Sequence, residues 1–89
     1  MLTIFGYDSN IHKCAYCDNA KRLADVKKIP YQFVNVMPEK GVFDDEVISK
    51  LLKRLGRESA TGLTMPQIFF NADYIGGFTE LKSKIKELK

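Results

Sequence analysis

The chain has 89 residues, of which 45% are hydrophobic and 28% are charged, and its formal net charge is +3. This length and balance predict one small folded domain over residues 1–89 and exclude a disordered chain. No apolar run approaches the ~20 residues of a transmembrane helix, and the amino terminus lacks a basic start with a long apolar stretch, so we expect neither membrane contact nor secretion.

The first half of the chain predicts a strand, a helix and a second strand. Residues 2–7 are almost continuously apolar, as in a strand buried in the middle of a sheet. Residues 15–28 have helical periodicity with Ala20, Leu23 and Ala24 on the inward side, and Pro30 prevents the helix from continuing. Residues 31–36 alternate with a period of two and are rich in strand-forming residues. This order is a βαβ unit, with parallel strands and a right-handed crossover.

The second half predicts a helix, two short strands and a last helix. After a loop at residues 37–43, Asp44 and Asp45 are typical of a helix start and Gly56 of a helix end. The inward stripe of this helix is Val47, Ile48, Leu51, Leu52 and Leu55. A polar loop at residues 57–64 leads to strands at 67–70 and 74–75, joined by a turn at 71–73. The last helix, residues 78–88, has on one face Phe78, Leu81, Ile85 and Leu88.

The resulting order is β-α-β-α-β-β-α, which predicts an α/β fold with a small mixed sheet and helices on both faces. Basic residues gather in two places, and both groups fall on amphipathic helical patterns: Lys50, Lys53, Arg54 and Arg57, and Lys82, Lys84, Lys86 and Lys89. We interpret them as solvated helix faces and expect no nucleic-acid binding. Attraction of an anionic substrate or an acidic partner is the alternative.

The chain has two cysteines, Cys14 and Cys17, at a predicted strand-to-helix junction. Because residues i and i+3 are neighbours on one side of a helix, the two thiols lie close enough to form a small disulfide ring. Such a pair is typical of a redox dithiol. With so few cysteines and no secretion signal, we expect the protein to be located in a reducing cytoplasm. A disulfide there is more often catalytic than structural.

Cys14 is expected to be the attacking thiol. The nucleophile in thiol–disulfide exchange is the thiolate, and a free cysteine holds its proton up to about pH 8.5. The unpaired N–H groups and the positive dipole end at a helix start stabilise an anion there, and Lys13 and His12 add positive charge. Cys17, one turn further in, should be shielded and should act second, on the mixed disulfide.

The two cysteines, His12 and Tyr16 also allow interpretations without a redox function. The cysteines are also compatible with a structural disulfide, half of a zinc site or two idle thiols. Zinc needs four ligands, and the chain offers one histidine and no second cysteine pair, so we expect no metal. For His12 and Tyr16, plain surface positions are the alternative.

Three separated motifs give the chain a resemblance to glutaredoxins, within the thioredoxin fold. They are Cys14-Ala15-Tyr16-Cys17, Thr64-Met65-Pro66 just before the third strand, and Gly76-Gly77 before the last helix. Residues 7–14 and 37–45 resemble in particular the small dithiol glutaredoxins of tailed phages, also called phage thioredoxins. The resemblance covers essentially the whole chain.

The resemblance implies roles for residues around the dithiol. Pro66 matches a cis-proline that turns the Met65 backbone toward the site, where it can pair with an extended substrate. Gly76 and Gly77 match a glycine pair near the glutathione site, where a ligand can approach the backbone and the helix start can hold a carboxylate. The other implied glutathione contacts are Lys13, Tyr16, Thr79 and Glu80. Taken singly, the proline also fits an ordinary loop, and the glycine pair a plain turn.

Two positions depart from the family pattern. Glutaredoxins commonly keep acidic residues where this chain has Thr79 and Glu80, and only Glu80 preserves the acid. Ala15-Tyr16 stands where glutaredoxins commonly have Pro-Tyr and thioredoxins Gly-Pro. Without proline the first helical turn is less constrained, so the resemblance implies no reduction potential.

The function that the resemblance implies is a dithiol–disulfide oxidoreductase. We expect glutathione as cosubstrate, a host thioredoxin reductase as another electron source, and no tightly bound cofactor. The implied client is ribonucleotide reductase, hence deoxyribonucleotide synthesis, in the cytoplasm of a phage-infected bacterium, with the chain as a monomer. One rival is a protein that holds an iron–sulfur cluster between two subunits, against which a resolving Cys17 argues. Another is a processivity-type subunit with an idle dithiol, whose function Cys14→Ser would leave intact.

Overall fold

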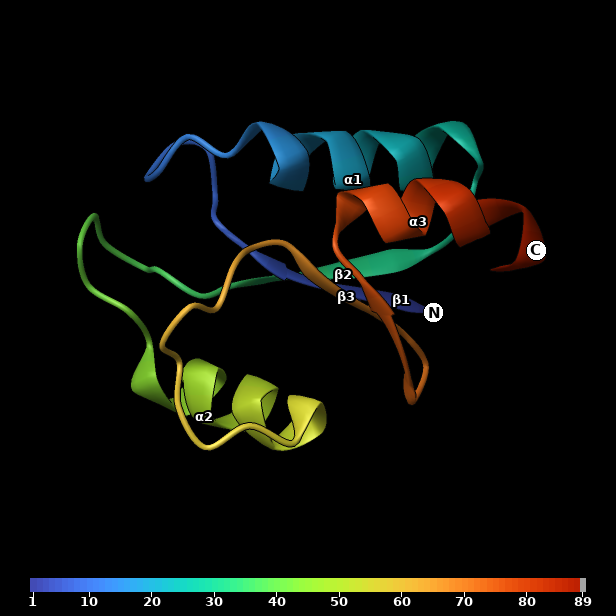
Figure 1. Ribbon diagram of the computed structural model, residues 1–89. Helices are drawn as coiled ribbons and strands as arrows, with labels where there is room; N and C mark the ends of the chain where they lie inside the picture. Colours follow the sequence, from blue (N-terminus) through green and yellow to red (C-terminus); the bar gives the residue numbers. More distant parts are fainter. Residues whose placement is uncertain (89) are drawn as a thin grey trace.

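A four-stranded mixed sheet forms the middle of the computed structural model, which describes residues 1–88 (Figure 1). Its strands are β1 (Leu2–Gly6), β2 (Tyr31–Asn35), β3 (Gln67–Phe70) and β4 (Asp73–Gly76), in the spatial order β2-β1-β3-β4. β1 pairs in parallel with β2 and antiparallel with β3, and β3 pairs antiparallel with β4. The predicted central strand and the parallel βαβ unit are therefore confirmed. Lys89, counted above among the basic residues, lies outside the described residues.

Helices cover both faces of this sheet. α1 (Ala15–Val26) and α3 (Phe78–Lys84), which continues into the 3-10 turn η1 (Ile85–Leu88), lie on one face, and α2 (Asp45–Leu55) lies on the other (Figure 1). The order β-α-β-α-β-β-α and the α/β class agree with the prediction. Among residues 1–88, no helix combines the length and the apolar character that crossing a membrane requires.

The side chains of β1 alternate between the two faces, and each face has its own apolar cluster. Leu2 and Ile4 pack on the side of α1 and α3, in a buried cluster with Ala20, Ala24, Ile29, Ile68, Ile75, Leu81 and Ile85. Phe5 lies on the side of α2, in a buried cluster with Val36, Leu51 and Phe69. Burial of one large apolar side chain is worth about 1.5–3 kcal/mol. The central strand is therefore stabilised from both sides.

Arg54 completes the cover of the sheet on the α2 side. Its guanidinium lies 3.9 Å from the centre of the Phe69 ring, and its Nη2 donates to the Asn71 carbonyl at 2.7 Å. Both contacts are stabilising for a cation. Arg54 is exposed, as expected for a solvated helix face, but it also anchors α2 to the sheet. Of the predicted inward stripe, Leu51 is buried, and Val47, Ile48 and Leu55 are half-buried against the same cluster. Leu52 is also half-buried but does not belong to that cluster.

α1 ends at Val26, earlier than the predicted end at residue 28. Lys28 adopts the left-handed conformation with φ +57°, and the Ile29 N–H turns back to donate to the Ala24 carbonyl. Helices commonly end in this way, usually with glycine at the left-handed position. α2 follows that rule, with Gly56 at φ +70°. The sequence did not indicate this helix end because the left-handed position is occupied by lysine and not by glycine.

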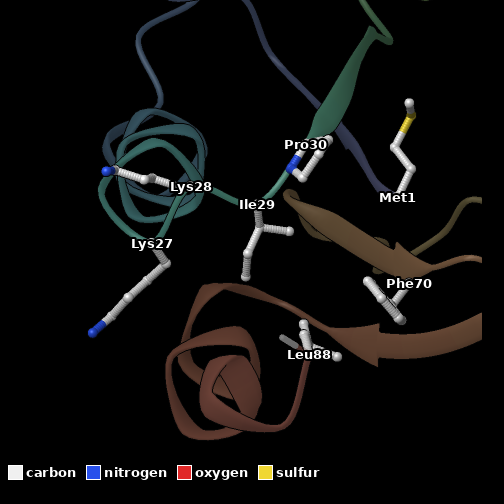
Figure 2. A pocket seen from close by; sticks show the side chains of 7 residues that line it. All are labelled: Met1, Lys27, Lys28, Ile29, Pro30, Phe70 and Leu88. Carbon is white, nitrogen blue, oxygen red and sulfur yellow. The ribbon is translucent and has the colours of Figure 1, made fainter.

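A hollow of about 630 Å³ lies at the start of β1, at the end of the sheet remote from the cysteines (Figure 2). Ile29, Phe70 and Leu88 give it apolar walls, and Lys27 and Lys28 stand at its edge. No thiol lines it. The chemistry of the dithiol therefore belongs to the opposite end of β1, where the chain enters α1.

We predict that Lys28→Gly stabilises the protein. Removing the Cβ relieves the left-handed conformation, and after the greater freedom of glycine in the unfolded chain is subtracted, the free energy of unfolding should rise by about 0.5–1 kcal/mol. Urea unfolding with an unchanged m value measures this difference. Lys27→Gly is the matched control: Lys27 has φ −86°, so glycine there should lower the stability. The same change in both variants would contradict this explanation of the helix end.

Candidate active site

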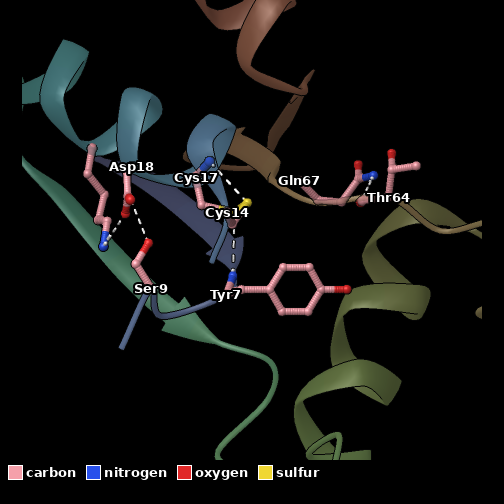
Figure 3. The surroundings of a disulfide bond; sticks show 8 residues. Tyr7, Ser9, Cys14, Cys17, Asp18, Thr64 and Gln67 are labelled. Carbon is pink, nitrogen blue, oxygen red and sulfur yellow. Dashed lines mark hydrogen bonds and ion pairs between the residues drawn. A yellow bond between two sulfur atoms is a disulfide. The ribbon is translucent and has the colours of Figure 1, made fainter. Parts of the chain in front are cut away.

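The two cysteines lie at the carboxyl end of β1 and the start of α1, where they form a disulfide (Figure 3). Their Cα atoms are 5.3 Å apart. Cys14 is the N-cap residue of α1, and its Sγ accepts a hydrogen bond from the Cys17 N–H at 3.2 Å. Cys14 is half-buried, whereas Cys17 has an exposed fraction of 0%. The expected proximity of the two thiols and the expected shielding of Cys17 are both present.

The start of α1 supplies the N–H groups that an anion at Cys14 needs. An N-cap side chain faces the unpaired N–H groups of the first turn and the positive end of the helix dipole. Once the disulfide is reduced, the Cys17 N–H is placed to stabilise a thiolate at Cys14. Lys13 and His12 are both exposed, and the His12 ring packs edge-on against Tyr7 at 4.7 Å between centroids. Within residues 1–88, His, Cys, Asp and Glu side chains do not gather in threes that could hold a metal ion.

Cys17 fits against β1 because residue 6 has no side chain. The Tyr7 N–H donates to Cys17 Sγ at 3.4 Å (Figure 3). A Cβ added to Gly6 would lie 2.8 Å from the same sulfur and 3.2 Å from the Phe33 ring. The distance to the sulfur is too short for unbonded atoms and the distance to the ring is tight, so a larger residue would push against the disulfide. Gly6 is not among the predicted site residues, although a glycine inside an apolar strand often marks such a close approach.

A second hollow, of about 220 Å³, lies between the start of α1, the loop before β3 and the start of α3. Its lining residues are Tyr16, Thr64, Met65, Pro66, Gly77, Phe78, Thr79 and Glu80. It brings together most of the predicted glutathione contacts from three separate segments; Lys13 and Gly76 are the two that do not line it. The Met65–Pro66 peptide bond is cis, as the resemblance implied. The exposed Tyr16 ring lies 6.2 Å from the Phe78 ring.

Glu80 is held against the helix start at the rim of this hollow. Its Oε1 accepts a hydrogen bond from the Gly77 N–H at 2.8 Å, which caps the first turn of α3. Gly76 is buried beneath the same side chain, since a Cβ there would lie 2.8 Å from Glu80 Cγ. The one acid of the Thr79-Glu80 pair is therefore a capping group as well as a lining residue.

A buried amide supports the loop that carries the cis bond. Gln67 is 6% exposed; its Nε2 donates to the Thr64 carbonyl at 2.6 Å (Figure 3), and its Oε1 accepts from the Tyr74 hydroxyl at 2.6 Å. Burial raises the pKa of Tyr74 above its ordinary value; the charge of Glu80 acts in the same direction and that of Arg57 opposes it. The hydroxyl therefore keeps its proton at neutral pH. The sequence did not indicate this pair, because the contact joins β3 to β4 across the hairpin.

Comparisons of the sequence identify its relatives. A family model described as Glutaredoxin matches residues 2–75. The chain is 61% identical to a glutaredoxin of Enterobacteria phage T4 over 87 residues, which is 97% of this chain and 100% of that protein. It is 32% identical to glutaredoxin 1 of Escherichia coli K12 over 79 residues, 83% of this chain and 84% of that protein.

Solved structures show the same fold. The structure of reduced Escherichia coli glutaredoxin matches with a TM-score of 0.67 and 31% identity, over 97% of this chain and 93% of that one. A buckwheat glutaredoxin in complex with glutathione matches with a TM-score of 0.68 and 26% identity, over 97% of this chain and 68% of that one. The predicted thioredoxin-like architecture is therefore confirmed.

We predict that Gly6→Ala both destabilises the protein and makes its disulfide easier to reduce. The added methyl should lower the free energy of unfolding by about 1–3 kcal/mol, as overpacking does. A free Cys17 thiol can rotate away from the methyl, but a disulfide sulfur cannot. The free energy of unfolding should therefore fall more in the oxidised form than in the reduced form. Urea unfolding of both forms and the rate of reduction by dithiothreitol measure these effects.

Gly41→Ala is the control for this substitution, because a Cβ at residue 41 would meet no atom within 4 Å and φ there is +83°. It should cost stability through backbone strain alone and leave the reduction rate unchanged. A wild-type reduction rate in Gly6→Ala would show that the Gly6–Cys17 contact is unimportant for the disulfide.

Proposed function

The chain belongs to the glutaredoxin family of thiol–disulfide oxidoreductases, and we propose that it reduces protein disulfides through a mixed disulfide at Cys14 that Cys17 resolves. The observation that carries this proposal is the difference in exposure of the two cysteines. Cys14 is half-buried at the N-cap of α1, and Cys17 is fully buried behind it. A substrate sulfur can reach the first and not the second, so exposure sets the order of attack.

Two exchange steps transfer two electrons. The Cys14 thiolate attacks one sulfur of the substrate disulfide; the Cys14–substrate bond forms, the substrate S–S bond breaks, and the other sulfur leaves as a thiolate that takes up a proton. Cys17 then loses its proton and attacks Cys14 Sγ, which forms the Cys14–Cys17 disulfide and releases the second substrate thiol. The Cα atoms already lie 5.3 Å apart, so this step needs no large backbone movement.

Glutathione is the proposed cosubstrate that restores the dithiol. Two glutathione molecules supply two electrons and leave as glutathione disulfide, and no tightly bound cofactor takes part. The hollow beside Tyr16 supports this proposal, as does the similarity to the buckwheat glutaredoxin, whose structure contains glutathione. The Met65 backbone would pair with the ligand as a strand does. The full set of proposed contacts is Lys13, Tyr16, Met65, Pro66, Gly76, Gly77, Thr79 and Glu80.

The proposed natural client is a ribonucleotide reductase in the cytoplasm of a phage-infected bacterium. The 61% identity to the glutaredoxin of phage T4 supports the phage setting. The client follows from the resemblance to phage glutaredoxins. We propose that the chain acts as a monomer and that a host thioredoxin reductase is a second electron donor.

We predict that Cys17→Ser traps the mixed disulfide and that Cys14→Ser prevents it. With glutathione disulfide, Cys17→Ser should gain the mass of one glutathione at Cys14, whereas Cys14→Ser should gain almost none because Cys17 is fully buried. Loss of the nucleophile should lower kcat/KM for insulin disulfides by about a thousandfold or more. Mass spectrometry and an insulin reduction assay measure both effects. Equal adducts on the two variants would contradict the assigned order of attack.

Equilibration with graded glutathione redox buffers tests the electron donor. The reduction potential of thioredoxin is about −270 mV, and those of glutaredoxins lie between about −200 and −230 mV. We expect a value in the glutaredoxin range together with a Cys14–glutathione adduct, and Cys14→Ser serves as the control without a dithiol. A value near that of thioredoxin with no adduct would make the reductase the main donor. A protein with no titratable dithiol would contradict the proposed function, and iron-dependent visible absorbance would favour the cluster-binding rival.

A further inference from the structure

Gln67 is a buried polar side chain to which the exchange chemistry assigns no role. Both ends of its amide are engaged, by the Thr64 carbonyl at one end and the Tyr74 hydroxyl at the other, each at 2.6 Å. Thr64 and Met65 line the hollow beside the dithiol, whereas Tyr74 lies on the edge strand β4. The amide therefore connects the outer strand of the sheet to the loop that contacts the proposed ligand.

The direction of these hydrogen bonds is fixed by chemistry. A backbone carbonyl only accepts, so the amide must present Nε2 to Thr64 and Oε1 to Tyr74. The Tyr74 hydroxyl must then donate, and a tyrosine hydroxyl holds its proton at neutral pH. Replacing Gln67 or Tyr74 with an apolar residue would therefore remove a donor from the same hydrogen-bond network.

The Thr64 carbonyl and the Met65 N–H belong to one planar peptide group. In a trans peptide these two groups point in opposite directions, so a hydrogen bond that holds the carbonyl toward Gln67 also points the N–H away from it. The cis bond follows this peptide, between Met65 and Pro66. The hydrogen bond from Gln67 therefore constrains the orientation of the Met65 N–H.

We propose that Gln67 and Tyr74 are positioning residues that orient the Met65 N–H toward the disulfide substrate. This inference rests on the proposed function, in which the Met65 backbone pairs with glutathione or with an extended client. It places part of substrate recognition outside the glutathione hollow, on two residues that touch neither the ligand nor the cysteines.

Gln67→Met and Tyr74→Phe test the proposal, with glutathione and the mixed disulfide of glutathione with 2-mercaptoethanol as substrates. Loss of the amide should raise the KM for the mixed disulfide by about three- to tenfold, and loss of the hydroxyl by about two- to fourfold, as expected for one hydrogen bond. kcat should stay within about twofold and the reduction potential should not change, because neither residue touches the sulfurs. The double variant should behave like Gln67→Met, since both residues act through one bond.

Gln32→Met and Tyr31→Phe are matched controls, because both residues lie on β2, the opposite edge of the sheet. Their KM values should equal that of the wild type. If Gln67→Met fails to fold, Tyr74→Phe decides the question, because Tyr74 is 50% exposed and tolerates the loss of its hydroxyl.

Lower unfolding free energies with unchanged KM values would overturn the inference and leave Gln67 as a purely structural hydrogen-bonding residue. In that case wild-type turnover of the mixed disulfide would still support the proposed function. A wild-type protein with no activity on the mixed disulfide would instead contradict the proposed function, and the inference with it. The amide chemical shift of Met65 gives an independent readout: it should change in both variants and not in the controls.

Discussion

The contact between the Cys17 sulfur and the end of β1 is the constraint on which the active site depends. The sulfur lies against the backbone of Gly6 and accepts the Tyr7 N–H, so the first turn of α1 cannot slide along the strand without moving the disulfide. β1 is a central strand packed on both faces, which makes it a fixed reference for the sulfur. This arrangement places Cys14 at the N-cap, where it is half-buried and its sulfur lies at the positive end of the helix dipole.

Side chains hold backbone groups in place around the proposed glutathione hollow. Gln67 holds the carbonyl before the cis bond, and Glu80 holds the N–H at the start of α3. A site of this kind depends on turns and helix caps more than on the identity of the side chains at its rim. This explains how the chain keeps the glutaredoxin fold with Ala15 between its cysteines and Thr79 at a position where the family commonly has an acid.

Local patterns predicted the order of the elements and the dithiol, because periodicity, helix caps and cysteine spacing are properties of neighbouring residues. The features that the sequence did not reveal depend on contacts across the sheet or on an unusual backbone conformation. Gly6 matters only because α1 brings Cys17 onto β1, and Gln67 only because β4 places Tyr74 beside it. The end of α1 was misplaced because Lys28 takes a conformation that glycine normally marks.

In the proposed function, the depth of Cys17 imposes a requirement on the client protein. The buried sulfur and the strand behind it are fixed, and Cys14 can be approached only at the start of the helix. The client must therefore present its disulfide on a segment that can extend toward the helix start and lose conformational freedom there. We therefore expect disulfides on mobile tails and loops to react faster than disulfides inside a rigid core. Which clients react fastest should then depend more on the mobility of the client's own chain than on a match between two preformed surfaces.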